Sequence, residues 1–267
     1  MKRVLTLQDY SCLGRCSLTV ALPTLSACGV ETVGIPTSLL SNHTQFPEWS
    51  LLDLKDELPT IFAHWDKIGV RFDAIQTGYL TTAQIPLVEK AIEKYRGDGL
   101  VFVDPAMADH GKLYPGFDLT HVEAMRSLVA VADVAKPNVT EAELLTRKKA
   151  EDGYEALAEE VAALGPKTVI LTGIERKEGT LSVLLYENKE CHWFDIEKLP
   201  GVYHGTGDLY CAAALGAFLA KGSWQKAIEI ANRFLSEAIR KTIEDKADGL
   251  LYGVEFEKVL PGLMQRK

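Results

Sequence analysis

The stretch Gly205-Thr206-Gly207-Asp208, followed by the apolar run Leu209 to Ala220, joins a tight glycine turn to a helix with a carboxylate in its first turn. Glycines let the backbone approach a ligand closely, and the unpaired amides of a helix start point toward an incoming anion. Asp208 would stand beside that anion, where it could deprotonate a hydroxyl group. Its alternative role is to cap the helix and to interact with the helix dipole. The stretch predicts a phosphate-binding turn next to a candidate base, at the start of a buried core helix.

Short apolar segments alternate with helical patterns along nearly the whole chain, as is typical of an α/β protein. The apolar segments have the composition of strands buried on both faces of a parallel sheet, and a turn at Asn188 predicts an antiparallel hairpin. We therefore predict one domain over residues 1–267 with a mostly parallel sheet and an antiparallel edge. The predicted strands are Val4 to Leu7, Thr32 to Pro36, Ala74 to Thr77, Leu100 to Val103, Val134 to Ala135, Thr168 to Leu171, and the hairpin Leu181 to Tyr186 with Glu190 to Phe194. The predicted helices are Ser17 to Ala27, Leu51 to Trp65, Ile85 to Tyr95, Leu119 to Val131, Tyr154 to Leu164, Leu209 to Ala220 and Trp224 to Thr242.

The composition favours a globular protein that acts on small ligands. The chain has 267 residues, of which 47% are hydrophobic, and its formal net charge is -8. This acidic balance argues against nucleic acid or an anionic membrane as a partner. The five cysteines form no CxxC pair, and the segment Met1 to Leu7 lacks the pattern of a signal peptide. We expect a cytoplasmic protein with free thiols.

Polar turns follow several of the predicted strands, at the sheet edge where α/β proteins collect their ligands. Asp104 follows the strand Leu100 to Val103, and Glu141 lies shortly after Val134 to Ala135. Their oxygens suit Mg²⁺ that bridges nucleotide phosphates. In the alternative interpretation Asp104 only forms a turn, and Glu141 only starts a helix that Thr140 caps. Together these turns favour phosphoryl transfer.

The common nucleotide and hydrolase signatures are missing from the sequence. It has no GxxxxGK[ST] phosphate loop and no GxGxxG after the first predicted strand, which disfavours Walker-type NTPases and NAD enzymes. It also lacks a GxSxG elbow and an HExxH helix, which disfavours common esterases and zinc proteases. A kinase that binds phosphate at a late helix start remains.

The order of three motifs resembles the ribokinase-like superfamily, and within it the vitamin-kinase branch. These motifs are the turn Asp104-Pro105-Ala106-Met107, the segment Pro137-Asn138-Val139-Thr140-Glu141 and the start Gly205-Thr206-Gly207-Asp208. Two further segments, Ser41-Asn42-His43-Thr44-Gln45 and Thr77-Gly78-Tyr79-Leu80, are similar to the substrate-side motifs of pyridoxal kinases. The resemblance covers nearly the whole chain and implies a three-layer αβα fold.

The resemblance implies transfer of the γ-phosphoryl group of ATP to the 5'-hydroxymethyl group of a B6 vitamer. Such transfer depends mainly on positioning and charge neutralisation. Asp208 would be the base, and the Gly205 to Gly207 amides the anion hole. Mg²⁺ would be held by Asp104 and Glu141, and a monovalent cation such as K⁺ is a further candidate cofactor. The resemblance also implies nucleotide contacts by Asp104, Asn138, Glu141, Thr172 and Gly173, vitamer contacts by Ser41, His43, Thr44 and Tyr79, and a homodimer.

The chain departs from the pyridoxal kinase pattern after the first predicted strand. Asp9 stands in the segment Gln8-Asp9-Tyr10-Ser11, where these kinases usually have a neutral hydroxyl residue. A carboxylate near the substrate would attract the ammonium group of pyridoxamine, which leads to the hypothesis of a preference for that vitamer. The alternative is that Asp9 only caps the turn before the helix from Ser17.

Two other functions stay open. Hydroxymethylpyrimidine kinases of thiamin synthesis share the superfamily turns, and the Ser41 to Gln45 segment argues against that substrate. A protein that binds a B6 vitamer without catalysis is the second, and the presence of Asp104, Glu141 and Asp208 argues against it. His43 is equally compatible with a structural hydrogen-bonding role.

Overall fold

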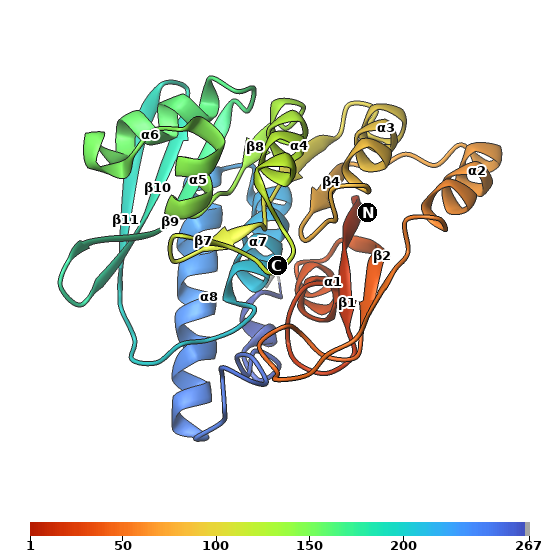
Figure 1. Ribbon diagram of the computed structural model, residues 1–267. Coiled ribbons are helices and arrows are strands. Elements are labelled where there is room, and N and C mark those ends of the chain that lie inside the picture. The colour runs from red at the N-terminus through yellow and green to blue at the C-terminus, as the bar shows by residue number, and fades with distance from the viewer. Residues whose placement is uncertain (265–267) are drawn as a thin grey trace. The chain divides into compact units, whose positions relative to one another are not determined.

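A computed structural model describes residues 1–264 of the chain. These residues form two compact units. The terminal unit comprises Met1–Leu54 with Ile196–Lys267, and the middle unit comprises Lys55–Asp195. Each unit combines strands with covering helices (Figure 1). The α/β class, the mostly parallel sheet and the antiparallel edge predicted from the sequence are confirmed.

The terminal unit places three strands in the order β1-β2-β3. Strands β1 and β2 are parallel, with a register shift between Gln8 and Tyr10, and β3 runs antiparallel to β2. Its elements are β1 (Arg3–Ser11), α1 (Leu18–Ala27), β2 (Glu31–Leu40), β3 (Leu51–Asp53), α7 (Thr206–Lys221), α8 (Trp224–Glu244) and the 3-10 turn η2 (Leu260–Gly262). Helix α7 buries every residue from Leu209 to Ala217, and Gly216 lets it approach Cys28 at the end of α1. The prediction of a buried core helix is therefore confirmed.

The middle unit places its strands in the order β11-β10-β9-β8-β5-β4. Strands β4, β5, β8 and β9 are parallel, and β10 pairs antiparallel with β9. Its elements are α2 (Leu58–Ile68), β4 (Ala74–Thr77), α3 (Ile85–Tyr95), β5 (Leu100–Val103), β6 (Ala108–Asp109), β7 (Lys112–Leu113), α4 (Leu119–Ala130), β8 (Val134–Ala135), α5 (Val139–Thr146), the 3-10 turn η1 (Ala150–Asp152), α6 (Tyr154–Ala162), β9 (Thr168–Lys177), β10 (Thr180–Glu187) and β11 (Glu190–Glu197), where the unit ends at Asp195. Helices α5 and α6 pack against β9, and α6 also covers β10 (Figure 1).

One predicted helix begins in the wrong place. The segment Leu51 to Trp65 is helical only from Leu58, and Leu51–Asp53 is strand β3. The backbone of Ser38 to Leu40 pairs with these three residues, and this pairing outweighs their helical pattern. Pro59 then suits the first turn of α2, where its missing N–H removes no helical hydrogen bond. Among the described residues, no helix has the length and apolar character needed to cross a bilayer.

Candidate active site

The glycine turn before α7 is fixed by a close backbone approach. Gly205 has a left-handed conformation with φ of 73°, and a Cβ atom there would lie 2.0 Å from the carbonyl oxygen of Arg15. Only glycine fits both conditions. Helix α7 begins at Thr206, so Asp208 lies in its first turn, as predicted. The first-turn amides have no partners within the helix and form a site suited to an anion.

Asp208 is held by the start of a second helix. Its Oδ2 atom accepts a hydrogen bond of 2.8 Å from the backbone N–H of Ser17, the N-cap residue of α1. Ser17 has a positive φ of 48°, which is uncommon for a residue other than glycine. The Asp208 carboxylate is only partly buried. It therefore interacts with two helix N-termini, and both favour a negative charge at this point.

Asp9 and Asp208 both interact with the segment Cys16 to Ser17. It is buried at the register shift between β1 and β2, and its Oδ2 atom accepts a 3.1 Å hydrogen bond from Ser11. Burial raises the pKa of Asp9, and hydrogen bonds from Ser17 and Ser11 offset part of that effect. Burial also raises the pKa of Cys16, and the negative charges of Asp9 and Asp208 add to the shift. The structure thus brings Asp9 and Asp208 to the same short segment.

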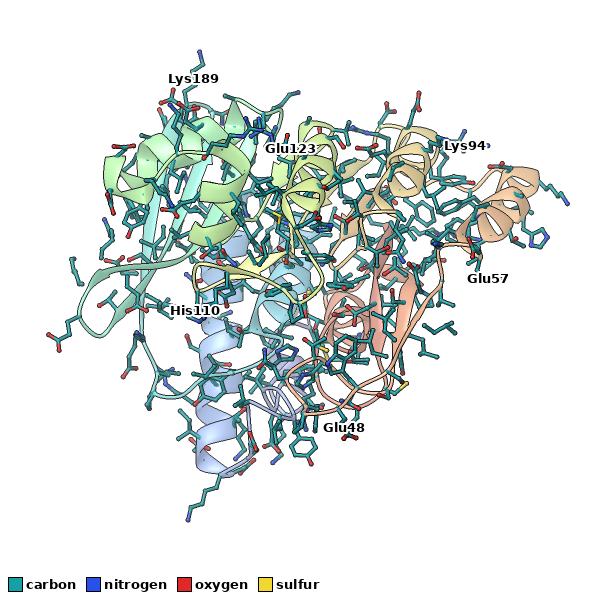
Figure 2. All side chains as sticks on the ribbon, viewed as in Figure 1. Glu48, Glu57, Lys94, His110, Glu123 and Lys189 are labelled. Atoms are coloured by element: carbon teal, nitrogen blue, oxygen red, sulfur yellow. The ribbon has the colours of Figure 1, made fainter. Side chains whose placement is uncertain are left out.

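The loop of residues 41–50 carries three predicted vitamer contacts. Ser41 Oγ accepts from the Ser50 amide at 3.0 Å and donates to Asn42 Oδ1 at 2.9 Å. Asn42 Nδ2 in turn donates to the carbonyl of Glu48, which is labelled in Figure 2. Ser41 therefore closes the base of the loop, and Thr44 lies exposed within it.

His43 is buried with both ring nitrogens in hydrogen bonds. Its Nδ1 accepts from the Gln45 amide at 3.2 Å, so Nε2 carries the proton and donates to the Leu251 carbonyl at 2.7 Å. The ring stacks on His204 with centroids 3.8 Å apart, and a Cβ on Gly14 would lie 2.4 Å from it. Burial lowers the pKa of His43. This geometry favours the structural alternative, because a vitamer contact through a ring nitrogen would break an existing hydrogen bond.

In the middle unit, Glu141 belongs to a capping box at the start of α5. Its Oε2 accepts from the Asn138 amide at 2.9 Å, and Asn138 Oδ1 accepts from the Glu141 amide at 2.9 Å. Glu141 Oε1 also accepts from the Met107 amide at 3.1 Å. The helix is therefore capped by Asn138, and the expected cap Thr140 instead accepts a hydrogen bond from the Gly111 amide. Gly111 and its neighbour His110, which is labelled in Figure 2, form the turn between β6 and β7.

Asp104 and Glu141 are both buried, and Lys136 is buried with them. The side chain of Asp104 is 5% exposed, and its Oδ2 lies 3.3 Å from Lys136 Nζ. Burial raises the pKa of Glu141, and the negative charge of Asp104 adds to this effect while Lys136 opposes it. The structure thus brings the two predicted metal ligands near one another, with the ammonium group of Lys136 beside Asp104. Lys136 was not among the site residues predicted from the sequence, although it directly follows β8 in the turn that leads to Asn138.

The predicted nucleotide contacts lie just after β8 and in the middle of β9. Asn138 forms a parallel bridge with Thr172, whose amide donates to the Pro137 carbonyl at 3.0 Å. Gly173 follows with φ of 74°. These residues therefore form one backbone surface next to Glu141.

Tyr79 follows β4 and belongs to a stack of three rings. It stacks on Phe117 with centroids 5.3 Å apart, and Phe117 stacks on His121 with centroids 3.6 Å apart. Asp104, at the end of the neighbouring strand β5, donates its amide to the Thr77 carbonyl at 3.3 Å. The stack gives Tyr79 a fixed, partly exposed ring face.

Asp104 and Glu141 fit Mg²⁺ held through its retained waters. Within residues 1–264 no group of three or more His, Cys, Asp or Glu side chains could enclose a metal ion. A two-carboxylate site suits an ion that keeps several waters and takes further ligands from phosphates. A cation bound here would favour the charged form of Glu141, whose pKa is raised by burial and by Asp104.

Comparison with known proteins agrees with these features. The family model described as phosphomethylpyrimidine kinase matches residues 21–249. The chain belongs to this family. A pyridoxal kinase of Arabidopsis thaliana is 30% identical, over 91% of this chain and 83% of the relative. A pyridoxine/pyridoxal/pyridoxamine kinase of Bordetella avium is 31% identical, over 93% and 88% respectively. A hydroxymethylpyrimidine/phosphomethylpyrimidine kinase of Aquifex aeolicus is 26% identical, over 89% and 94%.

Solved structures extend the likeness to the whole fold. A protein of Bacteroides thetaiotaomicron, described as of the phosphomethylpyrimidine kinase type and crystallised in a form with pyridoxal, is 35% identical with a TM-score of 0.93, over 100% of this chain and 96% of that one. Pyridoxal kinase of Leishmania donovani in complex with ADP and pyridoxamine is 26% identical with a TM-score of 0.84, over 100% and 97%. The resemblance predicted from the motifs is confirmed, as is the assignment to the kinases.

Proposed function

We propose that the protein transfers the γ-phosphoryl group of ATP to the 5'-hydroxymethyl group of a B6 vitamer, giving the 5'-phosphate for pyridoxal phosphate salvage. The observation that carries the proposal is the position of Asp208. Its carboxylate lies in the first turn of α7, three residues after a glycine that admits no Cβ, and it accepts a hydrogen bond from Ser17. A base and a set of anion-binding amides therefore come from one turn.

In this proposal Asp208 accepts the proton of the vitamer hydroxyl as its oxygen attacks the γ-phosphorus. The hydrogen bond from Ser17 orients the carboxylate that would accept this proton. The amides of Gly205, Thr206 and Gly207 stabilise the negative charge on the transferring phosphoryl group. The chemistry required of the protein is positioning and charge stabilisation, because phosphoryl transfer has a loose transition state.

Asp104 and Glu141 would hold Mg²⁺ through its waters. When bound, the ion neutralises charge on the β- and γ-phosphates. Asn138, Thr172 and Gly173 provide the backbone surface on which we propose that the nucleotide lies. The ADP complex of the Leishmania relative and the family assignment support the use of ATP.

On the vitamer side we propose contacts by Asp9, Ser41, Thr44 and Tyr79. Asp9 would interact with an amine substituent, and the ring face of Tyr79 suits a flat heteroaromatic. His43 would act indirectly, by supporting the loop of residues 41–50 through its hydrogen bonds and ring stack. A homodimer, inferred from the resemblance, is part of the proposal and is tested by light scattering on the purified protein.

The proposal is tested by measuring ADP release with pyridoxal, pyridoxine, pyridoxamine and hydroxymethylpyrimidine under identical conditions. We expect release that depends on an added B6 vitamer, together with a product heavier by one phosphoryl group in mass spectrometry. Asp208→Asn should abolish both signals. ADP release without a phosphorylated vitamer would contradict the proposal, and vitamer binding without any ADP release would identify a non-catalytic binding protein.

Hydroxymethylpyrimidine kinase is the second candidate because of the family model and the Aquifex relative. The same assay separates the two functions through kcat/KM for the two substrate types. A higher kcat/KM for hydroxymethylpyrimidine than for all three B6 vitamers would assign the protein to thiamin synthesis.

A further inference from the structure

Lys136 places a buried ammonium group beside Asp104, one member of the acidic pair. Its side chain is 6% exposed, and Nζ lies 3.3 Å from Asp104 Oδ2. Lysine is almost never buried to this degree without a partner, because removing its charge from water is strongly unfavourable. The position of Lys136 directly after β8 directs a long side chain toward the end of β5, whose backbone pairs with β8.

The second carboxylate, Glu141, completes the cluster. It is 2% exposed, and both of its oxygens accept backbone hydrogen bonds, from Met107 and Asn138. Lys136 also acts on this group, since its positive charge opposes the rise in the pKa of Glu141. The cluster therefore consists of two fixed carboxylates and one cation that the chain itself supplies.

Two carboxylates buried near one another repel each other, and a positive charge beside them offsets this repulsion. A protein can supply this charge with a cation bound from solution or with a lysine. The ammonium group carries the same single positive charge as K⁺ and, like K⁺, is satisfied by several oxygen atoms. We propose that Lys136 is a built-in monovalent cation, which keeps the acidic pair ordered and ready for the metal–nucleotide complex without K⁺ from solution.

The inference has one part that rests on the proposed function and one that does not. Nucleotide binding at the acidic pair belongs to the proposed function. The thermal stability of the protein without metal and nucleotide depends only on the cluster itself. Measuring both separates the failure of this inference from the failure of the kinase assignment.

The first measurement is thermal unfolding in the presence of EDTA. It is made once in KCl and once in tetramethylammonium chloride of equal ionic strength. We expect the same Tm for the wild type in both salts, because Lys136 already fills the site. Lys136→Met should lower Tm by roughly 5 to 15 °C in tetramethylammonium chloride, since one partner of a buried pair is lost. KCl should restore part of that loss, because K⁺ is small enough to replace the ammonium group.

The matched control is Lys94→Met, which removes a lysine from an exposed ion pair with Asp66 in the same unit (Figure 2). Its Tm should change little and show no difference between the two salts. If Lys136→Met does not fold, the double variant Lys136→Met/Asp104→Asn removes both charges. It should be more stable than Lys136→Met and insensitive to K⁺.

The second measurement is calorimetric titration with Mg-ADP in the same two salts. The wild type should bind equally in both, and Lys136→Met should bind about tenfold or more weakly in tetramethylammonium chloride, with recovery in KCl. A wild type whose binding requires K⁺ would overturn the inference. So would a Lys136→Met protein that is equally impaired in both salts, because Lys136 would then serve only as packing.

Discussion

The acidic side chains of the two units differ in burial and in hydrogen bonding. In the terminal unit Asp208 is partly buried, and its Oδ2 atom accepts a hydrogen bond from the backbone N–H of Ser17. In the middle unit Glu141 is buried with a backbone donor on each oxygen, and Asp104 is buried against Lys136. A proton acceptor must stay accessible to its substrate, whereas a fixed charge gains from complete burial and pairing. Asp208 is therefore placed to accept a proton, whereas Asp104 and Glu141 are fixed in positions suited to binding a cation.

The largest expected effect is on catalysis by the terminal unit. Asp208→Asn keeps the shape and an oxygen that can accept from Ser17, and it removes the base. We expect kcat to fall by about 100- to 10,000-fold, with vitamer binding and Tm nearly unchanged. Steady-state kinetics and calorimetry measure the two effects. The control Asp98→Asn changes an exposed aspartate and should leave both untouched. Near-normal turnover of Asp208→Asn would place the base elsewhere.

The next effect tests whether the anion-binding turn depends on close backbone contact. Gly205→Ala would place a Cβ 2.0 Å from the Arg15 carbonyl at a positive φ, and we expect a loss of about 3 kcal/mol or more in the free energy of unfolding. Gly222→Ala is the matched control at the other end of α7. It has φ of 68° with nothing within 4 Å, so only the conformational cost of about 1 kcal/mol remains. Equal losses in urea unfolding would show that the contact with Arg15 is unimportant.

A smaller loss is expected when a charge is removed from the middle unit. Glu141→Gln turns an NH₂ group toward the amide of Met107 or Asn138, and one donor loses its acceptor. We expect a loss of about 2 to 3 kcal/mol in the free energy of unfolding, together with weaker Mg-ADP binding. This result would contrast with Asp208→Asn, which should change kcat and leave stability intact. The control Glu143→Gln, in the same helix, changes a partly exposed side chain. Unchanged stability of Glu141→Gln would contradict the assignment of a fixed charge.

The site residues of the terminal unit were predicted from the sequence better than those of the middle unit. The glycine turn, the first-turn position of Asp208 and the buried helix after it follow from local rules on glycine, helix starts and apolar runs, and the structure agrees with all three. The partner of Asp208 could not be predicted in this way, because Ser17 is 191 residues away in the sequence. Local patterns carry no information on such contacts.

In the middle unit the carboxylates were predicted, and the arrangement around them was not. Helix α5 has only eight residues, too few for a clear helical pattern, and the backbone donors to Glu141 come partly from Met107 in another segment. The burial of Lys136 could not be predicted, because it depends on the position of Asp104 after a neighbouring strand. Strand β3 was missed for a similar reason, since its pairing with β2 outweighs the helical pattern of Leu51 to Trp65.

A weaker effect concerns two histidines with lowered pKa values, the partly buried His204 and the buried His121. Burial lowers the pKa of His204 in the terminal unit and of His121 in the middle unit to about 4. The negative charge of Asp118 opposes the shift of His121, and His43 adds to that of His204. In the unfolded chain each histidine binds a proton near pH 6.5, so stability is complete above that pH and is lost as the pH falls toward 4.

We expect each histidine to contribute a loss of about 1 to 2 kcal/mol between pH 7 and pH 5. His204→Phe and His121→Phe should each flatten the pH dependence of the free energy of unfolding, whatever their effect at pH 7. Urea unfolding at several pH values measures the slopes, and exposed His64→Phe serves as the control. If the variants have the same slopes as the wild type, these histidines have the same pKa in the folded and in the unfolded chain.

The smallest expected effect concerns vitamer choice beside Asp208. Asp9 is buried, and burial raises its pKa, so the approach of an ammonium group would favour its charged form. We expect kcat/KM to favour pyridoxamine over pyridoxal, and the preference to increase with pH as Asp9 ionises. Asp9→Ser should reduce the ratio by up to about tenfold, because one charge pair is lost. Ser11→Ala is the control, since it removes the 3.1 Å hydrogen bond and keeps the carboxyl group. An identical ratio in wild type and Asp9→Ser would leave Asp9 with only its hydrogen bonds to Ser11 and Ser17, as a residue that orders the segment before α1.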